Sequence, residues 1–288
     1  MRLILSILAV SFSVPAFLVF PASSLAEPEL VFLPEAVKQG EPLMITVKGR
    51  LENNSVKKIS FGGEAFPVFY YKSKPAALVG LDLNKKPGEY EIAAEFSDGF
   101  VLRKKVAIAE RKKVEAPLGI PQKLGGNTVQ SQNKLAATLA LENKNLAEMR
   151  TGKKSFWTGS FRFPLQENII TDDYGYSRKT GAYTIAHKGT DFRAQEGTPV
   201  MAMNRGVVRA AREYRNYGKT VVVDHGLGLM TLYMHLSEIK VNEGELVQRG
   251  QLLGLSGRTG YAEFPHLHLS VKINGVSVDP VKFVELFY

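Results

Sequence analysis

One stretch near the C-terminus decides the fold: residues 265–278 read PHLHLSVKINGVSV. Apolar side chains recur at every second position from His266 to Ile273, which is the pattern of a half-buried β-strand. Asn274-Gly275 is a tight-turn dipeptide, so Val276 to Val278 is expected to return as the second strand of a hairpin. Positions i and i+2 of a strand face the same side, so the imidazoles of His266 and His268 are predicted to share one space.

The segments before this hairpin continue the strand pattern. Val221-Val222-Val223 and Leu229 to Leu236 read as strands, and no helical periodicity occurs between about residues 190 and 278. We therefore expect residues 155–288 to form an antiparallel β domain.

All 5 histidines of the chain lie in this domain, between residues 187 and 268. His187 and Asp191 are four residues apart and can converge on one ion if the chain is extended at Gly189. Two histidines and one carboxylate are a usual ligand set of a catalytic zinc, which keeps a fourth position open for water. The same set also forms the facial triad of non-haem iron oxygenases.

The other two histidines have a structural interpretation when each is taken alone. His235 lies in an apolar run, where a hydrogen-bonded core histidine is typical. His225 follows Val223-Asp224 and is expected at a strand end or turn, in a structural role.

The upstream part of the chain is also β-rich. Between residues 27 and 110, short alternating runs such as Leu43 to Val47 and Tyr90 to Phe96 are separated by glycine-containing turns. This spacing predicts an immunoglobulin-like β-sandwich without histidine chemistry, a spacer or adaptor.

Residues 111–154 are predicted to be a basic linker that contains a helix. Asn127 is expected to cap the helix, with Gln130 three positions later. Leu135, Leu139, Leu146 and Met149 share one helical face, so the helix should pack on another part of the molecule.

Residues 1–26 have the features of an export signal. Arg2 precedes an apolar run from Leu3 to Phe20, and Ser24-Leu25-Ala26 offers small residues for a cleavage site. Because Pro15 interrupts the run, we expect cleavage after Ala26 rather than a retained membrane anchor. The predicted location is therefore outside the cytoplasm, in the periplasm or cell envelope of a bacterium, with no stable membrane span once the signal is cleaved.

Composition and charge narrow the classes further. The 288 residues include no cysteine, which excludes disulfides, thiolate zinc sites and cysteine nucleophiles. The net charge is +9, but residues 111–154 hold 9 basic and 3 acidic residues and thus 6 of the excess charges. Both predicted domains are nearly neutral, so we expect no nucleic-acid partner, which normally needs a basic face on a folded domain.

The ordered motifs between residues 160 and 284 resemble those of the lysostaphin-type, or LytM-domain, zinc metallopeptidases. The first motif is similar to His187-Lys188-Gly189-Thr190-Asp191, the middle one to Tyr233-Met234-His235-Leu236-Ser237, and the last to Pro265-His266-Leu267-His268. Gly244, Gly250, Gly254 and Gly257 match the intervening glycines, and Val278-Asp279-Pro280 matches the closing turn.

This resemblance implies a fold, a ligand set and a reaction. It implies a mainly β chain with a LytM-type antiparallel sheet in residues 155–288. It assigns His187, Asp191 and His268 as ligands of one Zn²⁺ per chain, and His235 and His266 as catalytic histidines that move protons and stabilise the oxyanion. The expected reaction is hydrolysis of peptide bonds in peptidoglycan, the expected substrate; an envelope protein is a further candidate partner.

Three other functions remain to be compared with this one. A retired LytM domain that regulates other hydrolases typically loses ligands, whereas this chain keeps all of them. An iron oxygenase does not account for the two additional histidines. A biotinyl or lipoyl carrier would need a lysine in the turn Met203-Asn204-Arg205-Gly206, which has none. Tyr261 to Pro265 and Leu269 depart from the family pattern near the last motif and leave the choice between glycyl-glycine and D-alanyl–diaminopimelate bonds open.

Overall fold

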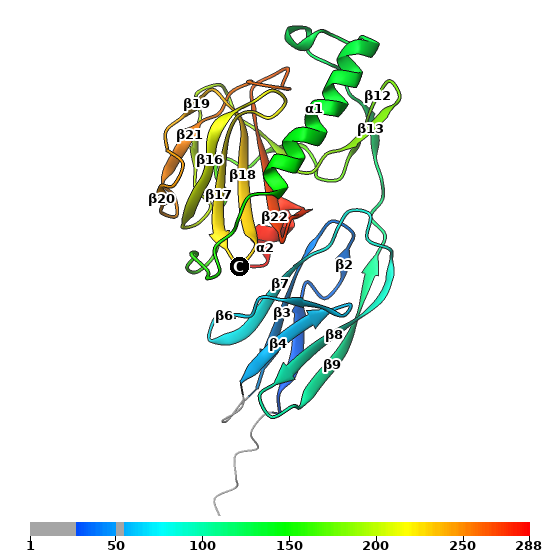
Figure 1. Ribbon diagram of the computed structural model, residues 1–288, viewed down its shortest axis with the longest axis vertical. Helices are drawn as coiled ribbons and strands as arrows, with labels where there is room; N and C mark the ends of the chain where they lie inside the picture. Colours follow the sequence, from blue (N-terminus) through cyan, green and yellow to red (C-terminus); the bar gives the residue numbers. More distant parts are fainter. Residues whose placement is uncertain (1–26, 50–54) are drawn as a thin grey trace, which may run out of the picture.

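Strands dominate the chain, as the sequence predicts, and they gather in two parts (Figure 1). The computed structural model describes residues 27–49 and 55–288, so the predicted export signal lies outside the described residues. Within those two ranges, no helix is both long and apolar enough to cross a bilayer.

The N-terminal part consists of two sheets that enclose one apolar core. Their orders are β1–β3–β7–β6 and β2–β9–β8–β4–β5. The strands are β1 Glu29–Leu33, β2 Val37–Lys38, β3 Pro42–Lys48, β4 Val56–Phe61, β5 Glu64–Phe66, β6 Phe69–Tyr71, β7 Lys74–Gly80, β8 Gly88–Phe96 and β9 Val101–Ala109. Leu43 and Val79 of the first sheet meet Ile59 and Ile92 of the second. This arrangement is a β-sandwich; its immunoglobulin-like type and its limits at residues 27 and 110 stay predictions.

The C-terminal part is built on an 8-stranded antiparallel sheet. Its order is β11–β14–β22–β18–β17–β16–β20, and β23 pairs with β22. The strands are β11 Ile170–Asp172, β14 Thr190–Arg193, β16 Gly206–Tyr214, β17 Gly218–Gly226, β18 Leu229–Leu236, β20 Leu246–Val247, β22 His266–Ile273 and β23 Val276–Val278. The predicted hairpin is present: Asn274 and Gly275 both have positive φ (49° and 81°), as a two-residue hairpin turn requires.

The remaining elements flank this sheet. A second sheet has the order β15–β21–β19 and a third β10–β12–β13. Their bounds are β10 Glu115–Pro117, β12 Ser177–Thr180, β13 Tyr183–Ala186, β15 Pro199–Met201, β19 Glu238–Ile239 and β21 Leu252–Leu255; the helices are η1 Gln122–Leu124, α1 Val129–Ala147 and α2 Pro280–Glu285.

The segment expected to be a linker is integrated into the C-terminal part. β10 pairs in parallel with β12, and α1 lies across one face of the large sheet (Figure 1). Leu146 of α1 is buried against Val222, Met230 and Leu232, which confirms that the helix packs on another element. The predicted cap is off by one residue: Thr128 caps α1 by accepting from the Ser131 N–H, while Asn127 accepts from the Ile120 N–H.

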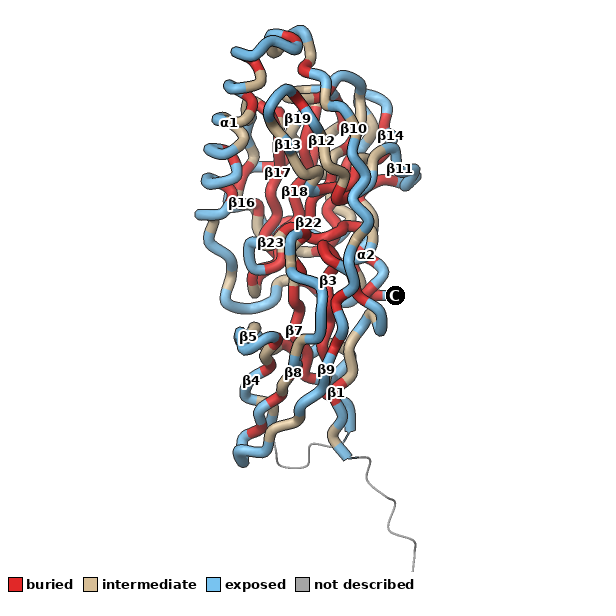
Figure 2. The backbone as a smooth tube through the Cα atoms, turned by 90° about the vertical axis from the view of Figure 1, so that its right-hand side faces the viewer, coloured by how far each residue is buried: buried red, intermediate tan, exposed pale blue. Residues whose placement is uncertain are grey.

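The two parts share apolar packing. Met44 and Leu78 of the sandwich belong to the same cluster as Phe161 and Phe283 of the C-terminal part. Arg111 adds an ion pair, with its guanidinium 3.1 Å from Asp279. Figure 2 shows buried backbone continuing from β3 and β7 into β22 and β23. The sandwich is therefore packed against the sheet that carries the histidines.

Candidate metal centre

Strand register brings three of the predicted residues together. His268 of β22 lies directly opposite Asp191 of β14, and His187 follows β13 immediately before β14 begins. The Nε2 atom of His187 lies 3.1 Å from Nδ1 of His268 and 3.2 Å from Oδ1 of Asp191. His268 Nδ1 lies 2.8 Å from the same oxygen. The two residues of the first motif and the second histidine of the last motif thus lie together. These three residues form a group that could hold a metal ion.

Hydrogen bonds on the far side of each imidazole determine which nitrogen faces this point. His187 Nδ1 lies 2.9 Å from the Asp173 carbonyl, which only accepts, so Nδ1 carries the proton. The Ser270 hydroxyl donates to the Lys188 carbonyl and therefore accepts from His268 Nε2–H at 3.0 Å. The neutral rings consequently direct unprotonated His187 Nε2 and His268 Nδ1 toward the carboxylate.

This arrangement fits a zinc ion. Tetrahedral ligands at about 2.0–2.1 Å from zinc lie about 3.3 Å from each other, close to the spacings above. Three lone pairs that point at one another without a shared proton repel, and a cation between them removes this repulsion. Outer hydrogen bonds of this kind orient metal-binding histidines in proteins.

Gly189 permits the close approach of the two strands. A Cβ atom at this position would lie 2.3 Å from Nε2 of His268 and 2.6 Å from the Leu269 carbonyl oxygen. Any side chain here would displace the His268 ring. The glycine inside the first motif is therefore a steric requirement of the ligand group.

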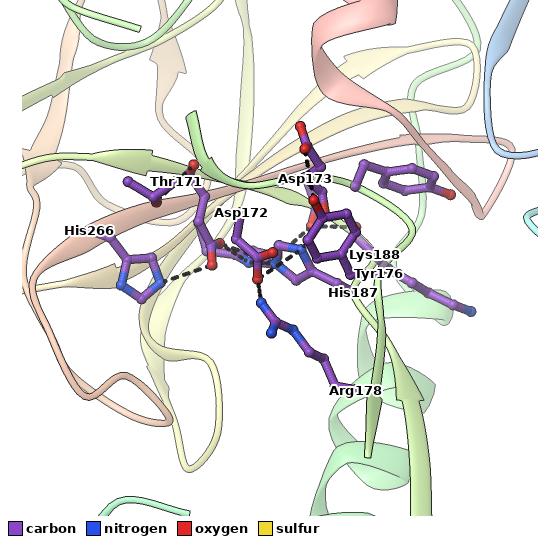
Figure 3. A network of polar contacts seen from close by, with 12 residues as sticks. Thr171, Asp172, Asp173, Tyr176, Arg178, His187, Lys188 and His266 are labelled. Atoms are coloured by element: carbon purple, nitrogen blue, oxygen red, sulfur yellow. Dashed lines mark hydrogen bonds and ion pairs between the residues drawn. The ribbon is translucent and has the colours of Figure 1, made fainter. Parts of the chain in front are cut away.

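A second layer of charge lies behind His187, and the sequence patterns do not reveal it. Asp172 of β11 forms an ion pair with Arg178 of β12, and its Oδ2 lies 3.7 Å from His187 Nδ1 (Figure 3). Both residues lie outside the recognised motifs. Their position depends on the pairing of β11 with β14, in which Asp172 faces Asp191.

His235 and His266 stand next to the ligand group with the same orientation. The ring centroids of the two residues are 4.9 Å apart, and His235 is 5.8 Å from His268. Each donates Nδ1–H to a backbone carbonyl at 2.9 Å, His235 to Thr259 and His266 to Phe264. Each therefore keeps an unprotonated Nε2, and that of His266 lies 3.7 Å from Oδ2 of Asp191.

The orientation of His235 requires an unusual backbone. Along β18, Tyr233 and Met234 belong to the cores on opposite faces of the sheet, so regular alternation would turn His235 away from Met234. Instead both residues line the same cavity. The φ of His235 is 59°, in the left-handed region that non-glycine residues rarely adopt, and this breaks the alternation. Sites of function often hold such strain.

Burial keeps the His235 imidazole neutral. Burial, followed by repulsion from His266 and His268, holds the pKa of His235 well below its usual value. The imidazole is thus neutral at pH 7 and able to accept a proton.

His225 has the structural role that its sequence context indicates. It is fully buried on the opposite face of the sheet, against Phe161. Its Nδ1 donates to the Arg205 carbonyl and its Nε2 accepts from the Thr231 hydroxyl, so neither nitrogen is open. Burial lowers its pKa to about 4.

A cavity of about 540 Å³ opens over the metal group. Its floor is the face of β22 that carries His266 and His268. Side chains of α1, including Leu135 and Leu139, form one wall, and Tyr183 and Ile185 of β13 form another. The helix of the predicted linker thus contributes to the cavity, which sequence reasoning did not anticipate.

A His-Asp-His group on a sheet, an accessible cavity and two more histidines are the features expected of a metallopeptidase domain. The sequence profile of peptidase family M23 matches residues 185–280. The peptidoglycan DD-endopeptidase ShyA of Vibrio cholerae is 46% identical over 96 residues, which are 33% of this chain and 22% of that protein. The DD-carboxypeptidase/endopeptidase Mpg of Neisseria meningitidis is 39% identical over 119 residues, 41% of this chain and 27% of that one.

The part of the chain that is similar to peptidase family M23 is therefore residues 185–280, which hold all five histidines. The match extends over about a quarter of the length of these relatives. A solved structure of a candidate M23 peptidase from Pseudomonas aeruginosa shares the fold over most of the chain. Its TM-score is 0.61 at 24% identity, and the alignment covers 87% of this chain and 96% of that one.

Proposed function

We propose that the C-terminal part, residues 155–288, is a zinc metalloendopeptidase that hydrolyses peptide bonds in the cross-links or stems of peptidoglycan. The observation that carries this proposal is the convergence of three unprotonated ligand atoms beside two imidazoles that each keep one free nitrogen. The name of the similar peptidoglycan DD-endopeptidase from Vibrio cholerae supports the substrate.

His187, Asp191 and His268 would hold one Zn²⁺ per chain. When bound, zinc supplies a Lewis acid that polarises a carbonyl and lowers the pKa of water toward ~7. The Asp173 carbonyl and the Ser270 hydroxyl keep the two imidazoles in the tautomers that this requires.

His235 and His266 would carry out the proton transfers. Their Nδ1–H groups are bound to backbone carbonyls, so Nε2 is the atom that accepts a proton from the attacking water and returns it to the leaving amine. The lowered pKa of His235 keeps it in the basic form at neutral pH. General acid–base catalysis of this kind contributes roughly 10²–10⁴-fold in rate. Once protonated, either Nε2–H can also donate to the developing oxyanion.

The walls of the cavity suit an extended peptide. The chain of the substrate would run along β22, between the apolar side chains of α1 and those of β13. Because α1 forms one wall of the cavity, the segment predicted to be a linker would shape substrate entry.

We place the protein in the bacterial envelope, exported by residues 1–26. Two observations support this location: the composition of residues 1–26, and the similarity of the C-terminal part to a peptidoglycan endopeptidase. An envelope protein remains a candidate partner.

The decisive experiment combines metal analysis with digestion of intact peptidoglycan. Purified residues 27–288 are expected to contain about one zinc per chain and to release fragments with new amine ends within the peptides, as read by mass spectrometry. His268→Ala should lose both the zinc and the cleavage. Lys240→Met, an exposed control that does not line the cavity, should retain both.

Two results would overturn the proposal. Bound zinc without cleavage would favour a domain that regulates other wall hydrolases. Bound iron with oxygen consumption would favour an oxygenase.

A further inference from the structure

The floor of the cavity extends well beyond the metal group. His266, His268, Ser270 and Lys272 occupy alternate positions of β22, and all four line the cavity. Lys272 is four residues beyond His268, which corresponds to about 13 Å along an extended strand. The cavity thus has the proposed metal ligands toward one end of β22 and the ammonium group of Lys272 toward the other.

In the part of the chain that the structure describes, no counter-charge lies beside the ammonium group of Lys272. Among residues 27–49 and 55–288, no carboxylate lies within 4.0 Å of it and no acceptor bonds to it. Its cross-strand neighbours are Met230 of β18 and Ser277 of β23, neither of which is charged. Arg178, another cation of the cavity, is neutralised by Asp172.

Burial makes this arrangement costly for the folded chain. Burial, with a smaller contribution from the nearby Lys188 ammonium, lowers the pKa of Lys272 to about 8. The side chain still carries its charge at pH 7. A partly buried cation without a partner destabilises a protein, so packing alone does not explain its presence.

We propose that Lys272, with Lys188 adding positive potential, binds a free carboxylate of the substrate peptide about three residues from the bond that is cleaved. This inference rests on the proposed function and refines its substrate class. An extended peptide advances about 3.3 Å per residue, so a chain that lies over His268 reaches Lys272 after three to four residues.

The charge distinguishes the two substrates that the sequence leaves open. A stem with a D-alanyl–diaminopimelate bond carries free carboxylates on diaminopimelate, a diamino dicarboxylic acid, and at the C-terminus of its peptide. The carboxylate beside the scissile nitrogen is too close to that bond to reach Lys272, so the carboxylate assigned to Lys272 is one further along the stem. A glycyl-glycine bridge carries none along its length. The uncompensated cation therefore favours anionic stem peptides over glycine bridges.

The test compares two peptides on two proteins. The peptides are a cross-linked stem dimer with a D-alanyl–diaminopimelate bond and the same dimer with its free carboxylates amidated. Binding is measured by calorimetry on zinc-loaded residues 27–288, with the scissile amide reduced so that no cleavage occurs. Wild type should bind the free-carboxylate form about tenfold to a hundredfold more tightly.

The variants locate the effect. Lys272→Met should lose this preference, Lys272→Arg should keep most of it, and Lys240→Met should match wild type. With cleavable dimers, Lys272→Met should raise KM for the anionic form and leave kcat nearly unchanged, because the residue is remote from the reacting atoms. Lys272→Gln provides a second neutral variant.

The outcomes separate this inference from the proposed function. If wild type and all variants cleave both dimers and none of them distinguishes the free-carboxylate dimer from the amidated one, the carboxylate site is overturned and the peptidase stands. Preferential binding without cleavage by wild type would support the site and overturn the peptidase. Neither binding nor cleavage would overturn both.

Stability gives an independent readout. Because burial penalises the ammonium group, Lys272→Met should have a Tm at pH 7 equal to or above that of wild type. A clear decrease would assign Lys272 a structural role and contradict the inference.

Discussion

The two faces of the large C-terminal sheet both carry buried histidines, and they use them differently. On the face opposite α1, His225 has partners for both nitrogens, the Arg205 carbonyl and the Thr231 hydroxyl. On the face that opens into the cavity, His235 has a partner for Nδ1 alone. Burial lowers the pKa of both residues. What distinguishes the proposed catalytic histidine from the structural one is therefore the nitrogen left without a partner, not the degree of burial.

The largest expected effect is a loss of activity when the histidines with an open Nε2 are removed. His235→Ala and His266→Ala should each reduce kcat by about 10²–10⁴-fold, because each removes a proposed proton-transfer group and leaves the three proposed metal ligands in place. Zinc content should stay near one per chain. Peptide release from peptidoglycan and metal analysis on the same samples would test this.

The matched change on the opposite face of the sheet, the closed face, is His225→Gln. It should lower stability without reducing the kcat of the folded protein. Full activity in either His235→Ala or His266→Ala would remove that residue from the mechanism, and zinc loss would make it a structural support of the metal group.

The second effect concerns the part of the open face that α1 covers. Leu146 is buried against Val222, Met230 and Leu232, so Leu146→Ala should cost about 2–5 kcal/mol in the free energy of unfolding. Urea denaturation would measure this. Leu141→Ala, on the exposed side of the same helix, should change stability by less than about 0.5 kcal/mol. Equal losses in both variants would show that α1 does not depend on this contact.

These comparisons also show which features the sequence could predict. Strand β22, its hairpin and the shared face of His266 and His268 follow from a period of two and a turn dipeptide, which are local signals. The meeting of His187 with His268 needed the family resemblance, because the pairing of β14 with β22 joins positions about 80 residues apart.

Other features depend on long-range structure and were missed. The orientation of His235 contradicts regular alternation, since it rests on a single left-handed residue. Asp172 and Arg178 reach the site through pairings of β11 and β12 that no motif marks. The integration of residues 111–154 into a cavity wall was hidden by a composition typical of a connector.

The third effect is the contribution of His225 to the pH dependence of stability. Burial lowers the pKa of His225 to about 4 from a value near 6.5 in the unfolded chain. Between these values the unfolded chain binds more protons at this residue, so stability should decrease as the pH falls from 6.5 to 4, by up to about 3 kcal/mol. Denaturation of metal-free wild type and His225→Gln across this range would isolate the contribution. Parallel pH profiles would contradict it.

The smallest effect is on stability and concerns the N-terminus of α1, the helix that covers part of the open face. Thr128 Oγ1 accepts from the Ser131 N–H and thereby satisfies one free donor of the first turn, so Thr128→Ala should cost about 1 kcal/mol. Asn127→Ala removes a bond to Ile120 outside the helix instead. Far-UV circular dichroism during urea unfolding should therefore show the α1 signal weakened by Thr128→Ala and unaltered at low denaturant by Asn127→Ala. The reverse order would restore Asn127 as the cap and place the beginning of α1 one residue earlier.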